Sequence, residues 1–135
     1  MAEYVMRNLL EKKGLSDRIS SASAATSTEA LGSPVHPGTR RILSRLGIDC
    51  GEKRAVQVNR ADYDRYDYLV VMDERNLRSL FKILPGDPAD KVYKLLDFTG
   101  RNADVADPWY TGDFEKTYQD ISAGCQGLLA HILSK

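Results

Sequence analysis

Four consecutive residues near the C-terminus, Asp107-Pro108-Trp109-Tyr110, offer the clearest chemistry in this chain of 135 residues. They place a carboxylic acid beside a proline, which restricts the backbone, and beside two large aromatic rings. Such a carboxyl group could donate a proton to a leaving oxygen while the rings face an aromatic substrate. Two other interpretations stay open from these residues alone: Asp107 could cap a turn, and the rings could belong to the core.

The composition limits the classes of protein to which this chain can belong. Its 19 basic and 19 acidic residues balance, which argues against binding to nucleic acid or to a membrane surface. No apolar run reaches the length of a membrane span, and the first residues do not resemble a signal peptide. Two distant cysteines, Cys50 and Cys125, then favour a reduced protein of the cytoplasm. The length predicts one domain over residues 1–135.

Apolar spacing predicts helices that alternate with strands. We expect helices over residues 2–13, 39–46, 74–84 and 114–133, and one helical turn over 60–65. We expect strands over residues 18–25, 67–73 and 91–98, and the continuous apolar centre of 67–73 suits a strand buried on both faces. This alternation predicts a three-layer α/β/α fold with a parallel sheet. Ligands of such sheets bind beyond the carboxyl ends of the strands, which places a site at the loop around Asp107.

Four segments, in this order along the chain, resemble the low-molecular-weight protein tyrosine phosphatases. They are residues 23–27 (SAATS), 66–77 (YDYLVVMDERNL), 107–110 (DPWY) and 113–118 (DFEKTY). Their order and spacing fit that family over the whole chain. The resemblance implies a flavodoxin-like α/β fold and hydrolysis of phosphotyrosine through a phosphocysteine, without a metal or another cofactor. It also implies that the substrate is a phosphotyrosine protein or an aryl phosphate.

The resemblance assigns roles to individual residues. In that family an aspartic acid protonates the departing tyrosine oxygen, and Asp107 occupies the matching position. Trp109 and Tyr110 would form the walls of the slot for the substrate ring. Glu29 would lie on the rim, where many relatives carry an aromatic residue. Ser23 would support the phosphate loop, and Asp73 lies at the end of a neighbouring strand.

The nucleophile of that family is a cysteine in a C-x5-R loop, whose backbone N–H groups and arginine hold the phosphate. We expect this loop, and the first central strand that leads into it, to be missing from the chain. Neither cysteine can replace it, because the position required for arginine holds Val56 after Cys50 and His131 after Cys125. The polypeptide as written is therefore predicted to have no phosphatase turnover.

A missing central strand would leave the edges of its neighbours unpaired, at about 1–3 kcal/mol for each buried unpaired group. Three outcomes are open. The chain could pair or exchange strands with another molecule, segments 18–25 and 67–73 could close into a narrower sheet, or the natural protein could be longer than this chain.

Two other functions also stay open: a catalytically inactive module that binds phosphoproteins, and a redox protein like the arsenate reductases that uses Cys50. Apart from that alternative, we expect Cys50 to be an incidental surface thiol and Cys125 to be a core residue. His36 is expected to be a loop residue, and His131 is expected to meet the negative end of the last helix.

Overall fold

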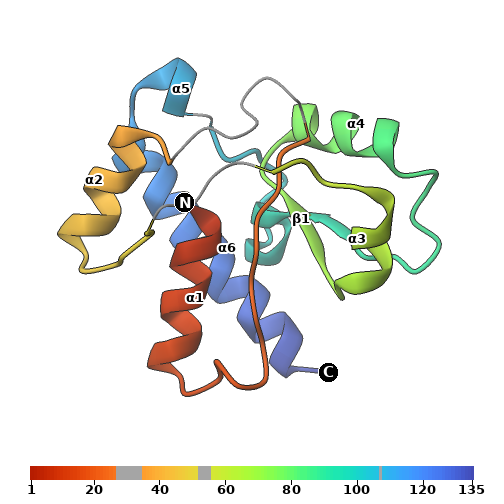
Figure 1. Cartoon of the computed structure of the whole chain (residues 1–135), viewed down its shortest axis with the longest axis horizontal. Helices are drawn as coiled ribbons and strands as arrows, with labels where there is room; N and C mark the ends of the chain where they lie inside the picture. Colours follow the sequence, from red (N-terminus) through yellow and green to blue (C-terminus); the bar gives the residue numbers. More distant parts are fainter. Residues whose placement is uncertain (27–34, 52–55, 107) are drawn as a thin grey trace.

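The computed structural model describes residues 1–26, 35–51, 56–106 and 108–135, with the side chains of Trp109 and Tyr110 left out (Figure 1). In chain order, the elements are α1 (Ala2–Lys12), α2 (Pro37–Arg45), α3 (Arg60–Arg65), β1 (Leu69–Val71), α4 (Glu74–Ile83), β2 (Val92–Lys94), the 3₁₀ helix η1 (Leu95–Thr99), α5 (Pro108–Thr111) and α6 (Phe114–Leu133).

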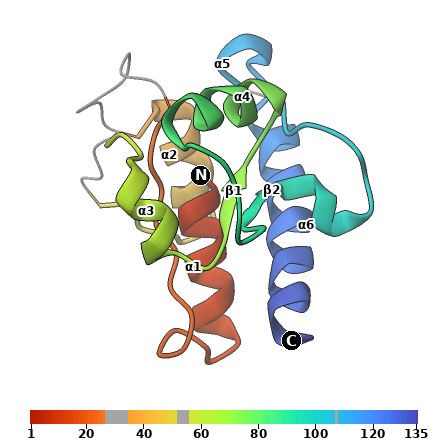
Figure 2. The same ribbon diagram turned by 90° about the vertical axis from the view of Figure 1, so that its right-hand side faces the viewer.

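Strands β1 and β2 form a parallel pair, in which Leu69 lies opposite Val92 and Val71 lies opposite Lys94. Side chains alternate between the two faces of a strand, so β1 contributes to two separate clusters. Leu69 and Val71 pack with residues of α4, whereas Val70 packs against the cluster formed by α1 and α6. Figure 2 shows the strands between these two groups of helices. The predicted α/β fold with a parallel sheet is confirmed.

The long helix α6 packs against both α1 and η1. Two glycines allow η1 to approach it closely. A Cβ atom on Gly124 would lie 2.4 Å from Cγ of Leu95, and one on Gly127 would lie 2.4 Å from the carbonyl oxygen of Phe98. A side chain at Gly127 would therefore push η1, and the loop that follows it, away from α6, and one at Gly124 would displace the Leu95 side chain.

Side-chain caps define the starts of the helices around the site. Asp73 accepts a hydrogen bond from the backbone N–H of Asn76 at the start of α4, and Asp113 accepts one from Lys116 at the start of α6. The predicted boundaries of both helices agree with the structure to within one residue. The start of α2 was predicted two residues too late, because His36 caps it through Nδ1.

Both histidines lie where they were predicted, His36 outside the helices and His131 in the last turn of α6, but each makes contacts that the sequence did not indicate. His36 caps α2, and its ring stacks on Phe114 with the two ring centroids 5.0 Å apart. His131 does not simply meet the end of α6: its ring packs against Tyr68 and Phe98, and its Nε2 atom is buried without a hydrogen-bond partner in the described part of the chain.

Two of the predicted strands are wrong in part. Residues 19–24 are not a strand, and Ala25 alone forms a bridge, which pairs it with Gln57 rather than with β1. The segment 91–98 is a strand only as far as Lys94 and continues as η1. The turn of η1 is favoured because Asp97 accepts a hydrogen bond from the Lys94 backbone at 3.1 Å. No helix in the described ranges is both long and apolar enough to cross a bilayer.

Candidate active site

The loop that leads toward the predicted proton donor begins after Gly100, which ends η1 with a positive φ of 78°. We call residues 101–106 the acid loop. Asp107 itself lies outside the described residues. Beyond it the chain continues as α5, a single helical turn with Pro108 in its first position.

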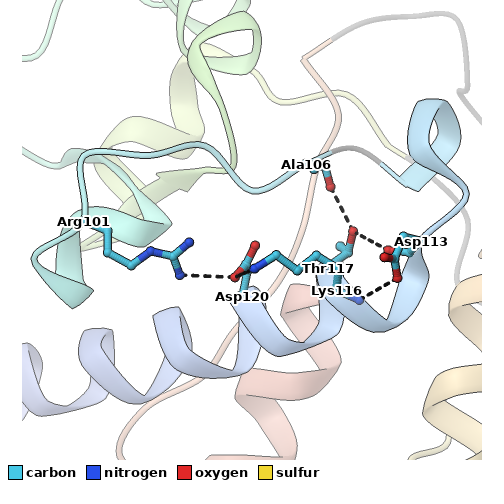
Figure 3. Close-up of polar contacts among 6 residues, drawn as sticks. All are labelled: Arg101, Ala106, Asp113, Lys116, Thr117 and Asp120. Carbon is cyan, nitrogen blue, oxygen red and sulfur yellow. Dashed lines mark hydrogen bonds and ion pairs between the residues drawn. The ribbon is translucent and has the colours of Figure 1, made fainter.

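The far end of the acid loop is held by β1 and α6. The hydroxyl group of Thr117 donates to the carbonyl oxygen of Ala106 at 2.9 Å (Figure 3). The backbone N–H of Val105 donates to the carbonyl oxygen of Met72, also at 2.9 Å. Thr117 is 3% exposed and Val105 is 2% exposed, so both donor residues are shielded from water. The residue before Asp107 is therefore fixed between the sheet and α6.

The beginning of the acid loop is attached to the same helix by an ion pair. Nη1 of Arg101 lies 3.2 Å from Oδ1 of Asp120, and Nζ of Lys116 lies 3.1 Å from the same oxygen (Figure 3). Asp120 is 5% exposed, while both cations reach solvent. A carboxylate this buried is stabilised by such partners, because its desolvation is costly without them.

A third attachment comes from Lys94, the last residue of β2. Its Nζ atom lies 3.0 Å from Oδ1 of Asp104 in the acid loop and 3.2 Å from Oε1 of Glu74 in α4. The hydrogen bonds to Asp104 and Glu74 raise the pKa of Lys94 above its usual range, although burial acts against them. The bond from Lys94 in turn lowers the pKa of Asp104. Lys94 and Asp104 are therefore charged near neutral pH, and the Lys94 cation joins β2 and α4 to the loop.

A pocket of about 430 Å³ lies beside the end of the acid loop. The end of β1, the first turns of α4 and the acid loop surround it, and its lining includes Asp73, Asn76, Arg78 and Ala106. The structure thus brings Asp73 and the residue before Asp107 to one pocket. This pocket lies beyond the carboxyl end of a parallel strand, where a site was predicted.

Ser23 lies against α1 and is not part of the pocket lining. Its hydroxyl donates to Oε1 of Glu3 at 2.6 Å, and Nη2 of Arg7 donates to Oε2 of the same carboxylate at 2.7 Å. The hydroxyl of Ser21 donates to the backbone oxygen of Glu3 at 2.9 Å. Glu3, which is 7% exposed, therefore ties the extended segment around Ser23 to the first turn of α1.

The remaining predicted site residues are not placed by the structure. Glu29, like Asp107, lies outside the described residues. Trp109 and Tyr110 lie in the helical turn α5, directly after the proline, and only their backbone is described. Their roles, and those of Ser23 and Asp73, stay predictions.

Both cysteines are free and buried. Cys50 is 4% exposed and packs in the core cluster, so the prediction that it is a surface thiol is wrong, and a redox role for it is not favoured. Cys125 is the predicted core residue. Burial raises the pKa of Cys125 to about 12, which keeps this group a thiol rather than a nucleophilic thiolate at neutral pH.

Sequence reasoning missed the residues that anchor the acid loop, namely Lys94, Thr117 and Asp120. Thr117 lies in the matching segment 113–118, but no role was assigned to it, and Asp120 has a local partner only in Lys116, four residues earlier. The partners of these residues in and beside the acid loop are distant in sequence. Glu3 had a weak signal, since it begins a helix and has Arg7 one turn later. In the described ranges, no three His, Cys, Asp or Glu side chains gather in a way that could hold a metal ion.

Comparison with known proteins identifies the family to which this chain belongs. The family model described as "Low molecular weight phosphotyrosine protein phosphatase" matches residues 1–135. The Low molecular weight protein-tyrosine-phosphatase YfkJ of Bacillus subtilis (strain 168) is 41% identical over 134 residues, which cover 98% of this chain and 86% of the relative. The protein-tyrosine-phosphatase PtpA of Staphylococcus epidermidis is 34% identical, with 98% of this chain and 84% of PtpA covered.

Solved structures agree with this result. The crystal structure of YfkJ from Bacillus subtilis matches with a TM-score of 0.93 at 40% identity, over 98% of this chain and 85% of that one. The low molecular weight protein tyrosine phosphatase SP-PTP from Streptococcus pyogenes matches with a TM-score of 0.83 at 35% identity, over 96% and 81%. The chain therefore belongs to the low molecular weight phosphotyrosine protein phosphatase family.

Proposed function

We propose that this chain is the acid-bearing part of a phosphatase that hydrolyses phosphotyrosine in proteins, or aryl phosphates, with Asp107 as the proton donor. The observation that carries the proposal is the placement of Ala106. Its carbonyl is held by Thr117 at the rim of a pocket beyond the carboxyl end of β1, and Ala106 directly precedes Asp107 in the sequence. The relatives at 34–41% identity are named as tyrosine phosphatases.

The chemistry assigns separate tasks to a cysteine and to Asp107. A cysteine thiolate attacks phosphorus, the bond from phosphorus to the tyrosine oxygen breaks, and its electron pair leaves with that oxygen. Asp107 in its acid form supplies the proton that the oxygen needs. The resulting carboxylate then takes a proton from water as the water attacks the phosphocysteine. No metal takes part in this scheme.

The other predicted residues support this reaction in the proposal. Trp109, Tyr110 and Glu29 border the substrate ring. Asp73 caps α4 beside the pocket and so orders its wall, consistent with its 2.7 Å bond to the Asn76 backbone. Ser23 acts through its bond to Glu3, at the start of α1.

The attacking cysteine must lie in a C-x5-R loop, and neither Cys50 nor Cys125 begins one in these 135 residues. We therefore expect no turnover from the 135-residue polypeptide by itself. We expect turnover from a polypeptide in which a strand and a C-x5-R loop precede Met1, as the resemblance to the family implies. The acid and the nucleophile are then contributed by separate segments of one fold.

Release of nitrophenol from its phosphate ester at mildly acidic pH tests both statements. In the longer polypeptide, Asp107→Asn should lower kcat by about 100-fold or more, because general acid catalysis typically contributes 10²–10⁴-fold. Replacing the loop cysteine by serine is the control that sets the background. Cysteine-dependent turnover by the 135 residues alone, or an undiminished kcat for Asp107→Asn, would contradict the proposal.

Two statements about the surroundings of the protein stay predictions. The edge of β1 opposite β2 is a surface for pairing or strand exchange between copies, which light scattering across a concentration series measures. We also place the protein in the cytoplasm, in keeping with its two free cysteines.

A further inference from the structure

The acid loop is attached more densely as it approaches Asp107. Its first residue, Arg101, is tied to α6 by one ion pair, and Ala103 packs against the core cluster. The last three residues are each attached to a different element: Asp104 to β2, Val105 to the end of β1, and Ala106 to α6. Three consecutive attachments restrict the backbone more than is usual for a surface loop, because such loops are generally more mobile than the elements they connect.

The last of these attachments acts on the peptide group next to the proposed acid. The carbonyl of Ala106 belongs to the planar peptide unit that joins Ala106 to Asp107. A hydrogen bond from Thr117 to that oxygen therefore restricts the orientation of this plane. Thr117 is 3% exposed, and its β-branched side chain has few rotamers in a helix, so the donor itself is held firmly.

From this geometry we propose that Thr117 is a positioning residue for the proton donor. The inference rests on the proposed function of Asp107 and extends it to a residue of α6 that touches neither substrate nor the reacting atoms. Thr117 fixes the peptide group before Asp107, and Lys94 supports it by holding Asp104.

A simpler role for Thr117 has to be distinguished from this one. Its hydroxyl also lies 3.2 Å from the backbone oxygen of Asp113, four residues earlier, which is the usual internal bond of a threonine in a helix. The hydroxyl has one proton, and the Ala106 oxygen is nearer, at 2.9 Å. If the internal bond were the only one that mattered, removal of the hydroxyl would leave the acid loop unchanged.

The first test uses the 135-residue chain and amide hydrogen exchange. Thr117→Val removes the hydroxyl but keeps the branched shape, and it should raise the exchange rate of the Val105 N–H about fivefold, the factor expected for the loss of one hydrogen bond. Thr117→Ser should restore the slow rate. Ser134→Ala is the matched control, because it removes a hydroxyl-to-backbone bond of 2.7 Å at the other end of α6. An unchanged Val105 rate in Thr117→Val would overturn the inference.

The second test asks whether the loop matters for proton transfer. In the longer, turnover-competent polypeptide, kcat is compared for phenyl phosphate, a poor leaving group, and nitrophenyl phosphate, a good one. A misplaced acid should lower the phenyl-to-nitrophenyl ratio, by about fivefold for Thr117→Val, whereas a general loss of folded protein lowers both rates equally. Thr117→Ser should restore the ratio.

Asp107→Asn separates failure of the inference from failure of the proposed function. A lowered ratio in Asp107→Asn together with an unchanged ratio in Thr117→Val would overturn the inference alone. An unchanged ratio in Asp107→Asn would show that Asp107 is not the acid, and both proposals would fall. In that case, the exchange rate of Val105 would still report whether Thr117 holds the loop.

Discussion

Gly127 makes the close contact between α6 and η1 that sets the origin of the acid loop. A Cβ atom at this position would lie 2.4 Å from the carbonyl oxygen of Phe98 and 2.9 Å from its carbonyl carbon, well inside the 3.4 Å at which ordinary contact begins. The obstacle is backbone, so it cannot rotate away as a side chain could. Gly127→Ala must therefore move η1 or bend α6.

The size of the effect follows from two opposed terms. Alanine in a helix interior is favoured over glycine by about 1 kcal/mol. Overpacking against a rigid neighbour costs about 1–3 kcal/mol and sometimes more, and an overlap of this depth with backbone belongs at or above the upper end. We expect Gly127→Ala to lower the free energy of unfolding by about 2 kcal/mol, which corresponds to a fall in Tm of about 8 °C for a chain of this size.

Urea unfolding followed by circular dichroism measures this change, with two variants for comparison. Gln126→Ala, at the exposed neighbouring position, should alter the stability by no more than about 0.5 kcal/mol. Gly124→Ala should cost less than Gly127→Ala, because the atom it meets is Cγ of Leu95, in a side chain that can adjust. A Gly127→Ala variant as stable as the wild type would refute the close approach of η1 to α6.

Two further predictions concern the loop between α4 and β2 and the start of α2. Asp87→Asn should lower stability at neutral pH by about 1–2 kcal/mol, because the carboxylate accepts bonds from the Tyr63 hydroxyl and the Lys91 backbone. Burial raises the pKa of Asp87, but these hydrogen bonds lower it by more, so the folded-state pKa lies below the unfolded one. The stability that wild type has over Asp87→Asn should therefore be fully present above pH about 4 and should shrink as the pH falls below it. Free energies of unfolding of both proteins at several pH values measure this difference. His36→Ala should be less stable than His36→Asn by about 1 kcal/mol, because asparagine can still accept a hydrogen bond from the Gly38 N–H and alanine cannot. The melting temperature of His36→Ala should therefore be the lower of the two. Equal melting temperatures would contradict the cap.

The helices could be predicted from the sequence because their signals are local. Apolar spacing and the capping side chains of Asp73 and Asp113 lie within the segments they define. The start of α2 was predicted too late because its N-cap is His36, which is not among the common N-cap residues. Strands depend on a partner elsewhere in the chain, and residues 19–24 find none among the described residues, whatever their β propensity.

The end of β2 also depends on a contact with a distant part of the chain. Leu95 and Leu96 are both buried, and two adjacent apolar residues suit a strand buried on both faces as well as a 3₁₀ turn. What decides between them is the bond from the Lys94 backbone to Asp97 and the space that Gly127 leaves on α6. The second of these is a tertiary contact, which no window of sequence around Leu95 contains.

The residues that support the acid loop could not be predicted from the sequence. Asp107 and its aromatic neighbours form a contiguous string whose types suggest acid catalysis beside an aromatic ring, and with the resemblance to the family this stays a prediction. Thr117 and Lys94 are ordinary residues of a helix and a strand, and they acquire a role only because the acid loop passes beside them. The anchoring of a loop by distant side chains leaves no pattern in one sequence.

The contacts that hold the acid loop all arise between residues 72 and 120. None of these polar contacts involves α1 or the described residues around Ser23, although Val105 packs in the core cluster that also contains Tyr4 and Val5 of α1. The polar contacts of residues 101–106 therefore lie within one continuous part of the chain. We accordingly expect the exchange rate of the Val105 N–H to be the same in the 135-residue chain and in a longer polypeptide in which a C-x5-R loop precedes Met1.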